Sequence, residues 1–309
     1  MPIRHVSDTA HWVAMYRALE SERGDALFND PYARALAGQH GASIAREVPH
    51  GDSMAWAMVV RTAVMDELIL ACVERGAAAV LNLGAGLDTR AFRLTLPPAL
   101  RWLDVDLPEM VAHRRACLKE ATPTCAHTHV VADLSDPAAV DKALATARKA
   151  HGPLLVVSEG LLIYLEPAQV RCLAQQLHAE ANARWWLTDL VSPMLLGMVG
   201  THWPSNEAAA SAPFRFAPRD SCKFFEPLGW HEEDFRSTLD ESVRLDRAPP
   251  MARWWSAFTP PWWPGARENV RRMAGVALMN AARPVSAQLQ TVRDSMPSSS
   301  RPRAQAFTG

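Results

Sequence analysis

Cysteine is scarce in this sequence, and neither sign of charge is in excess. The five cysteines are scattered and never occur in a CxxC spacing (Cys72, Cys117, Cys125, Cys172 and Cys222). A disulfide framework or a structural zinc site is therefore not expected, and the cysteines are interpreted as reduced. The 32 basic residues nearly balance the 33 acidic ones, which gives a net charge of -1. That balance gives no reason to expect a nucleic-acid or anionic membrane partner.

Long apolar runs are also missing. Asp8, His11, Arg17 and Glu20 interrupt the first part of the chain, so we expect no secretory signal. The longest apolar stretches are too short to span a bilayer, which predicts no membrane helix and a cytoplasmic location. With 309 residues, of which 49% are hydrophobic, the chain can bury a large core in one α/β domain, alone or with a cap.

Short apolar runs alternate with longer helical patterns in the middle of the chain. This alternation is typical of a parallel sheet with crossover helices. The predicted strands end in small or acidic residues and cover Ala78–Leu83, Arg101–Asp106, His129–Asp133, Leu154–Ser158 and Trp185–Asp189. The last strands are placed at Phe214–Phe216 and Val243–Leu245. The sequence thus predicts a doubly wound, Rossmann-like and mostly parallel α/β sheet, whose ligands bind at the carboxyl ends of the strands.

Three regions are expected along the chain. Residues 1–76 hold two helical patterns, about Thr9–Glu22 and Met54–Arg75, and predict a helical cap. Residues 77–283 form the predicted ligand-binding core, with an irregular insertion at about 191–211 after the fifth strand. Residues 284–309 are mostly small and polar, which is typical of disorder.

A glycine-rich turn follows the first predicted strand. Gly84 and Gly86 allow the backbone to approach a bound nucleotide, and Asp106 lies at the end of the next strand, where it can bind both ribose hydroxyls. A dinucleotide turn normally has a third glycine and places a pyrophosphate at the helix start. Here Thr89 takes the third position, and Asp88 would repel a pyrophosphate. The turn favours S-adenosylmethionine, which carries an ammonium and a sulfonium group, over a nicotinamide dinucleotide.

Arg61 falls on the apolar stripe of the second helix, which turns its guanidinium inward. Arginine is rarely buried without a partner. One interpretation is an internal ion pair with an acidic neighbour such as Asp66 or Asp88, and the other is a bidentate clamp on the carboxylate of the donor's methionine part.

Two further strand ends complete a predicted cup. Asp133 and Leu134 are placed to bind and cover an adenine, although Asp133 is also a plausible cap for the helix around Pro137. Glu159 is placed at the sheet edge nearest the methyl group, with a salt-bridged surface glutamate as the alternative.

These motifs together resemble the leucine carboxyl methyltransferase family, which includes eukaryotic protein-phosphatase methyltransferases and bacterial polyketide O-methyltransferases. The likeness covers roughly residues 5 to 260 and rests on Asp8–Ala10, Asp30–Tyr32, Arg61, Asn82–Arg90, Asp104–Pro108, Asp133–Leu134 and Glu159–Leu165. It implies a class I methyltransferase fold and S-adenosylmethionine as cofactor, with no metal. It also implies that Arg61 binds the donor carboxylate, Gly84 the methionine part, Asp106 the ribose, Leu134 the adenine and Glu159 the amino end.

One departure from the family concerns the acceptor. Members that modify phosphatases carry a lysine in the first helix, whereas the nearest cation to Trp12–Ala14 here is Arg17. This shifts the expectation from a protein C-terminal carboxyl group toward a carboxyl or hydroxyl group of a small metabolite, such as a polyketide-like acid. A silent donor-binding protein is a further alternative, and an open pocket beside Glu159 would favour an enzyme.

Methyl transfer mainly requires alignment of the reactants and exclusion of water. A carboxylate acceptor needs no base, whereas a hydroxyl acceptor does. The candidate bases or orienting groups are Tyr164, Asp189 and His202. His202 lies in the insertion, which is a candidate lid. The sequence does not indicate an oligomeric state.

Overall fold

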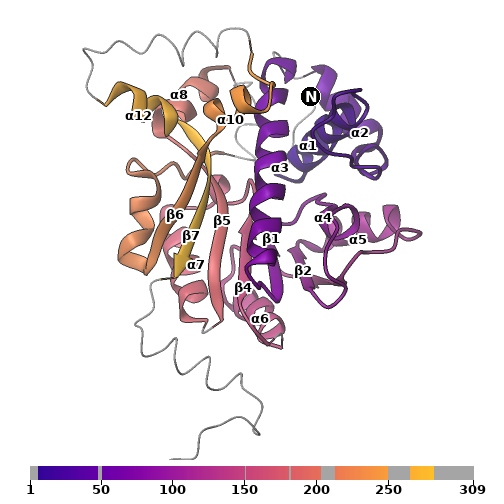
Figure 1. Cartoon of the computed structure of the whole chain (residues 1–309), viewed down its shortest axis with the longest axis vertical. Coiled ribbons are helices and arrows are strands. Elements are labelled where there is room, and N and C mark those ends of the chain that lie inside the picture. Colours follow the sequence, from indigo (N-terminus) through magenta and orange to yellow (C-terminus); the bar gives the residue numbers. More distant parts are fainter. Residues whose placement is uncertain are drawn as a thin grey trace, which may run out of the picture.

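The computed structural model describes residues 6–47, 51–149, 151–180, 182–202, 213–249 and 265–281, and forms an α/β fold around one sheet (Figure 1). The strands are β1 (Ala79–Leu83), β2 (Arg101–Asp106), β3 (Ala126–Val131), β4 (Leu154–Ser158), β5 (Ala183–Val191), β6 (Trp230–Ser237) and β7 (Ala274–Ala281). The helices are α1 (Val6–Ser21), α2 (Ala33–Glu47), α3 (Gly51–Glu74), α4 (Arg90–Arg93), α5 (Pro108–Cys117), α6 (Pro137–Ala147), α7 (Pro167–Ala179), α8 (Pro193–His202), α10 (Thr238–Arg244) and α12 (Ala266–Arg271), with the 3-10 helices η1 (Leu162–Tyr164) and η2 (Ser221–Leu228).

The strand order is β3-β2-β1-β4-β5-β7-β6, and the first five strands along the chain are parallel. Strand β7 runs antiparallel to both β5 and β6. The predicted doubly wound, mostly parallel sheet is therefore confirmed. The chain reverses its winding between β1 and β4, which places a topological switch point at their carboxyl ends.

The two faces of the sheet bury different side chains. Along β1, Val80 faces one core cluster with residues of α3 and α5, whereas Leu81 and Leu83 face a second cluster with residues of α6 and α7. This alternation follows from the two-residue period of a strand. Because helices cover both faces, all five β1 residues are buried, as expected for a strand of a parallel sheet.

Proline begins three of the crossover helices. Pro108, Pro137 and Pro167 are the first residues of α5, α6 and α7. At that position the missing N–H costs no hydrogen bond, and the fixed φ suits the helix.

Three strand predictions differ from the structure. The segments Phe214–Phe216 and Val243–Leu245 are not strands, because the first has no regular structure and the second lies at the end of α10. The last strands are instead β6 and β7. Strand β3 begins three residues earlier than predicted and ends at Val131, so Asp133 lies in the loop beyond it. The predicted irregular insertion after β5 instead begins with a helix, α8, and its residues 203–211 lie outside the described part of the chain.

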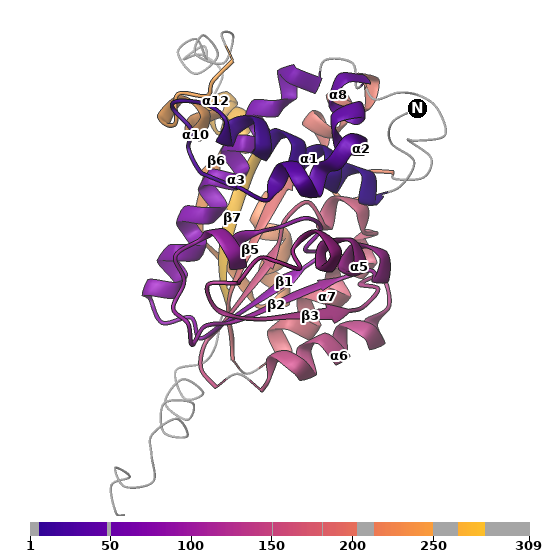
Figure 2. The same ribbon diagram turned by 90° about the vertical axis from the view of Figure 1, so that its right-hand side faces the viewer.

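The N-terminal helices lie over the carboxyl ends of the strands. Figure 2 shows α1, α2 and α8 gathered at the end of the molecule above β1, β2 and β3. The long helix α3 runs beside the sheet (Figure 1). The predicted domain boundaries after residues 76 and 283 stay predictions, and the tail 284–309 lies outside the described residues.

Candidate functional site

A cavity of about 520 Å³ lies at the carboxyl edge of the parallel strands. The segments after β1, β2, β4 and β5 line one side, and α1, α3 and α8 line the other. Its volume is in the range of roughly 300–1,000 Å³ typical of small-molecule sites. The cavity brings together every predicted site residue except His202: Arg61, Gly84, Gly86, Asp88, Asp106, Asp133, Leu134, Glu159, Tyr164 and Asp189. His202 ends α8, and its side chain lies outside the part of the chain that the structure describes.

The glycine-rich turn after β1 is tightly enclosed. Gly84 and Gly86 have φ angles of 63° and 51°, in the left-handed region that glycine adopts without strain. A Cβ on Gly84 would lie 3.1 Å from Cδ1 of Leu161, and one on Gly86 would lie 3.3 Å from Cβ of Ala10. The turn therefore requires glycine for its conformation and for its close contact with α1.

Asp106, the last residue of β2, braces this turn from the neighbouring strand. Its two carboxylate oxygens accept hydrogen bonds from the backbone N–H groups of Gly86 and Leu107. Burial raises the pKa of Asp106, although these two hydrogen bonds act in the opposite direction. Each oxygen retains a second lone pair, so Asp106 fixes the turn and still offers acceptors to a ligand in the cavity.

Arg61, in the middle of α3, faces the cavity and joins two strand ends. Its Nε donates to Glu159 and its Nη1 donates to Asp189, each at 2.9 Å. The prediction of an inward guanidinium is confirmed. The predicted alternative, an internal ion pair with an acidic residue, is present in the structure. Its partners, however, are Glu159 after β4 and Asp189 within β5, and not Asp66 or Asp88.

Glu159 lies between two arginines at the centre of the site. It accepts from Arg61 and from Nη1 of Arg90, the latter at 2.7 Å. Burial alone would raise the pKa of Glu159, but Arg90 and Arg61 outweigh it and lower the pKa to about 2. The alternative of a surface glutamate is wrong, since its side chain is only 15% exposed and lines the cavity.

Asp189 holds Arg61 and the loop after β4 in place. One carboxylate oxygen accepts from Arg61, and the other accepts from the backbone N–H of Gly160 at 2.7 Å. Gly160 has a φ of 63°, and a Cβ there would lie 3.6 Å from Nη1 of Arg61. Because both oxygens of Asp189 already accept hydrogen bonds, the geometry suits orientation of Arg61 better than proton abstraction.

Tyr164, in η1, contributes its hydroxyl to the wall formed with α1. The hydroxyl donates to Oγ1 of Thr9 at 3.3 Å, and the ring lies 5.7 Å from that of Phe214. Burial raises the pKa of Tyr164, so the phenol stays protonated at neutral pH. As placed, Tyr164 gives its single hydroxyl proton to Thr9, and its oxygen keeps acceptor capacity for a ligand. This arrangement suits an orienting group rather than a base.

Asp133 and Leu134 form the far end of the cavity. Asp133 is exposed, and its Oδ1 accepts from the backbone N–H and the hydroxyl of Ser135. The alternative that Asp133 caps the next helix is wrong, because Asp136 accepts from the N–H of Ala138 at the start of α6. Leu134 is half-buried and packs against the core on the α6 side of the sheet. Asp133 and Leu134 can therefore contact an aromatic ring bound at this end of the cavity.

The most buried charged residue of the site was not predicted from the sequence. Arg90 is 2% exposed, and it donates to Asp66, Asp88 and Glu159. Arg17 of α1 also lines the cavity, and it donates to Asp30 and to the carbonyl of Leu87. Their signal in the sequence is weak: Arg90 only follows the turn, and Arg17 was noted as the nearest cation of the first helix.

Asp104 is a buried anchor behind the turn. It accepts from Asn82, Trp102, Arg114 and His127, and Arg114 and His127 hold its pKa below the ordinary value despite burial. Asn82 in turn donates to Asp88. Asp104, His127 and His129 have ligand atoms within 4.8 Å of one another, but the donors around Asp104 occupy its lone pairs. This group therefore suits support of the turn better than metal binding.

The donor set of the cavity fits the predicted cofactor. Two carboxylates, Asp88 and Glu159, line the wall beside the turn, where a pyrophosphate would be repelled and an ammonium group would be stabilised. Arg61 and Asp106 supply a cation for a carboxylate and acceptors for ribose hydroxyls. Gly84 and Gly86 line the cavity without side chains, so a ligand can approach their backbone. The residues present thus match the charges of S-adenosylmethionine.

The chain matches the leucine carboxyl methyltransferase family model over residues 10–178. It is 33% identical to a candidate S-adenosyl-L-methionine-dependent methyltransferase of Frankia alni over 248 residues, which is 74% of this chain and 83% of the relative. A candidate S-adenosyl-L-methionine-dependent methyltransferase of Streptomyces coelicolor is 36% identical over 58% of this chain and 68% of its own length.

Two solved structures share the fold. One is a DUF574 family protein from Streptomyces avermitilis, with a TM-score of 0.55 and 16% identity over 87% of this chain and 96% of the other. The second, a candidate methyltransferase from Thermobifida fusca, has a TM-score of 0.54 and 17% identity over 92% of this chain and 97% of the other. In the part of this chain that the structure describes, every helix is too short or too polar to cross a membrane.

Proposed function

Because this chain belongs to the leucine carboxyl methyltransferase family, we propose that it transfers a methyl group to an oxygen atom of a small, largely apolar acceptor. The chain is an S-adenosylmethionine-dependent methyltransferase, and S-adenosylmethionine is its cofactor. The acceptor and the roles of individual residues are our proposal.

Each charged or polar group of the cofactor has a complementary residue in the cavity. Arg61 binds its carboxylate, and Asp106 accepts from its ribose hydroxyls. Glu159 and Asp88 would hold its ammonium group, and Gly84, Gly86, Asp133 and Leu134 would supply the other contacts. When bound, the cofactor supplies a methyl carbon activated by the adjoining sulfonium.

The protein's own contribution is alignment and exclusion of water. Helices α1, α3 and α8 enclose the cavity from the side opposite the sheet. Tyr164 keeps its proton because burial raises its pKa, and rotation of its hydroxyl away from Thr9 would let it donate a hydrogen bond to an acceptor oxygen. A carboxylate acceptor is already ionised and needs no base, whereas for a hydroxyl acceptor Asp189 or His202 would have to take the proton.

The observation that carries the choice of acceptor is the apolar wall beyond Glu159. This wall comes from α1, α3, α8 and the segment before η2, and it consists of Trp12, Val13, Met54, Met58, Leu195, Leu196 and Phe214. Burying a charged peptide against such a surface would carry a desolvation cost, whereas an apolar molecule would gain from burial. The wall is continuous with the cofactor end of the same cavity, which supports an enzyme over a silent donor-binding protein.

The proposal is tested by binding and turnover with the purified chain. Calorimetry is expected to show binding of S-adenosylmethionine and no binding of NAD. Transfer of a radioactive methyl group is then measured to apolar carboxylic acids, to phenols, and to peptides with a free C-terminal leucine. Methylation of the small acids or phenols supports the proposal. Methylation of the peptides alone, or of no acceptor despite binding of the cofactor, contradicts it.

Phe214→Ala is expected to raise the acceptor KM about tenfold, because truncating one large apolar side chain removes about 1.5–3 kcal/mol of burial. The Kd of S-adenosylmethionine is expected to stay unchanged, since Phe214 lies beside Tyr164 rather than beside the glycine turn. Initial rates over a range of acceptor concentrations, together with calorimetry of the cofactor, check both parts. If the acceptor KM and the cofactor Kd rose by the same factor, the assignment of this wall to the acceptor would be contradicted.

A further inference from the structure

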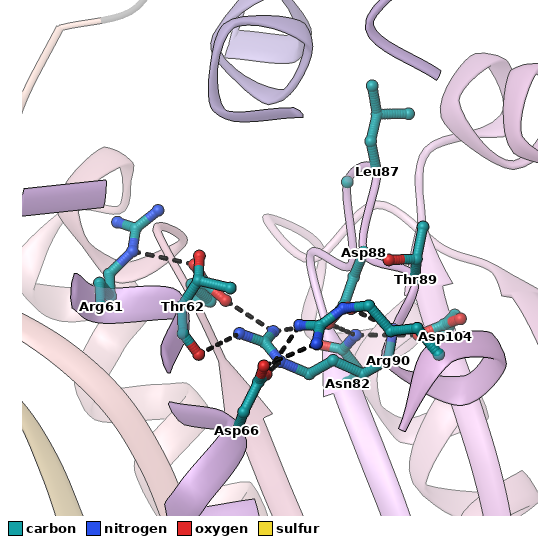
Figure 3. Close-up of polar contacts among 12 residues, drawn as sticks. Arg61, Thr62, Asp66, Asn82, Leu87, Asp88, Thr89, Arg90 and Asp104 are labelled. Atoms are coloured by element: carbon teal, nitrogen blue, oxygen red, sulfur yellow. Dashed lines mark hydrogen bonds and ion pairs between the residues drawn. The ribbon is translucent and has the colours of Figure 1, made fainter. Parts of the chain in front are cut away.

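Arg90 ties the cavity wall to a buried anchor that does not itself line the cavity. Its Nε donates to Asp66 of α3 at 2.6 Å, and its Nη1 donates to Asp88 at 2.8 Å and to Glu159 at 2.7 Å. Nη2 lies 3.5 Å from the carbonyl of Thr62. Figure 3 shows Arg90 reaching from the turn toward Asp66 and Thr62. One side chain thus connects α3, the turn after β1 and the loop after β4.

Asp66 is a fixed point because a second arginine holds it. Arg93 donates to both of its oxygens, at 2.6 and 2.8 Å. Arg93 is buried like Arg90, with a side chain 3% exposed. Within the described part of the chain, however, Arg93 forms no hydrogen bond or ion pair with Glu159 or Asp88. The two arginines therefore share an anchor but differ in whether they reach the two cavity carboxylates.

The charges around Arg90 do not cancel. Four arginines meet five carboxylates in this network, which leaves one negative charge in excess: Arg17, Arg61, Arg90 and Arg93 against Asp30, Asp66, Asp88, Glu159 and Asp189. Two of the carboxylates, Asp88 and Glu159, lie together beside the turn. Without a cation between them, they would repel each other and one would favour protonation. Arg90 allows both to stay ionised and close together.

The geometry points to Arg90 as a positioning residue that holds Glu159 and Asp88 as an oriented pair of carboxylates for the ammonium end of the methyl donor. This inference rests on the proposed function of the same site. A lysine would supply a single point charge in place of the planar fork that bridges three carboxylates. The role of Arg90 is therefore one of geometry as well as charge.

The test is the pH dependence of cofactor binding in Arg90→Gln, with Arg93→Gln as the matched control. In the wild type, Glu159 stays ionised well below neutral pH, because its pKa is about 2. Without Arg90, burial raises the pKa of Glu159 toward the experimental range. We expect affinity for S-adenosylmethionine to fall about tenfold between about pH 7 and pH 5 in Arg90→Gln. In the wild type and in Arg93→Gln, affinity is expected to stay nearly constant over that range.

The outcomes separate this inference from the proposed function. Absence of S-adenosylmethionine binding by the wild type contradicts the proposed function itself. Binding by Arg90→Gln with the same flat pH profile as Arg93→Gln shows that Arg90 is only structural and overturns the inference. Circular dichroism confirms folding before each titration. If Arg90→Gln does not fold, Arg90→Lys takes its place. It is expected to bind several-fold more weakly than the wild type, and wild-type affinity in Arg90→Lys would overturn the inference.

Discussion

Replacing Arg61 with alanine is expected to weaken the binding of S-adenosylmethionine about a hundredfold, because a charged hydrogen bond to a ligand carboxylate contributes about 1.5–3 kcal/mol. Arg61 is prepared for this role by its partners. Glu159 and Asp189 fix Nε and Nη1, and within the described residues Nη2 donates no hydrogen bond. The guanidinium thus faces the cavity, and its Nη2 can donate to a ligand carboxylate.

Ligands that differ in one chemical group isolate the contribution of the guanidinium. S-Adenosylhomocysteine has the same amino acid end as the donor, so its affinity is expected to fall by a similar factor in Arg61→Ala. Methylthioadenosine has no carboxylate, and its affinity is expected to be almost the same in the wild type and the variant. Calorimetry with the three ligands measures all of these changes.

A loss of affinity for methylthioadenosine as large as that for the donor would contradict the assigned contact. It would mean that Arg61 acts by holding the cavity together through Glu159 and Asp189. Arg61→Lys provides a second check, because it keeps the charge and loses the fork. We expect it to recover part of the affinity for the donor and little change with methylthioadenosine.

The parts of the site that the sequence predicted depend on local chemistry. Gly84 and Gly86 were predicted from a strand that leads into a turn, and the left-handed φ of each residue follows from that turn. The inward direction of Arg61 was predicted from the helical period of its neighbours. In both cases a few adjacent residues determine the conformation.

The partners of these residues depend on contacts that are distant in the chain. Glu159 and Asp189 lie 98 and 128 residues from Arg61 in the sequence. A helical pattern shows that a guanidinium faces inward, but it does not show which carboxylates it meets. Asp66 and Asp88, the carboxylates considered from proximity in sequence, are instead held by Arg90.

The antiparallel end of the sheet was missed for a similar reason. Strand β6 is an edge strand in which charged residues outnumber apolar ones, and it lacks a clear apolar alternation. Strand β7 is mostly small and apolar, a pattern that periodicity cannot assign to a strand or a helix. Pairing with β5 and β6 determines that it is a strand, and the pattern of adjacent residues does not predict that pairing.

Glu159→Gln is expected to lower the free energy of unfolding at neutral pH by about 3 kcal/mol, because it removes the carboxylate shared by two buried arginines. Arg61 and Arg90 would then face each other without the intervening negative charge. The expected loss of unfolding free energy also agrees with the pKa of Glu159, which is lowered from 4.5 to about 2. A pKa change of this size between the unfolded and folded states corresponds to about 3 kcal/mol of stability. Urea unfolding followed by circular dichroism measures the difference.

The pH dependence of that difference is the sharper test. A carboxyl group whose pKa is lowered in the folded state stabilises the protein fully above its unfolded pKa and loses the effect as pH falls toward its folded pKa. For Glu159 this window runs from about 4.5 down to about 2. The wild type and Glu159→Gln are therefore expected to differ most above about pH 5 and to converge as the pH approaches 2.

An exposed glutamate gives the control for this experiment. Glu22 pairs with Arg34, and both side chains are about half exposed, so Glu22→Gln is expected to change stability by less than about 0.5 kcal/mol across the same pH range. A Glu159→Gln difference that stays constant with pH would show that lost packing, rather than lost charge, destabilises the variant. Convergence would show that Arg61 and Arg90 keep Glu159 ionised, which is the state that an ammonium group of the donor requires.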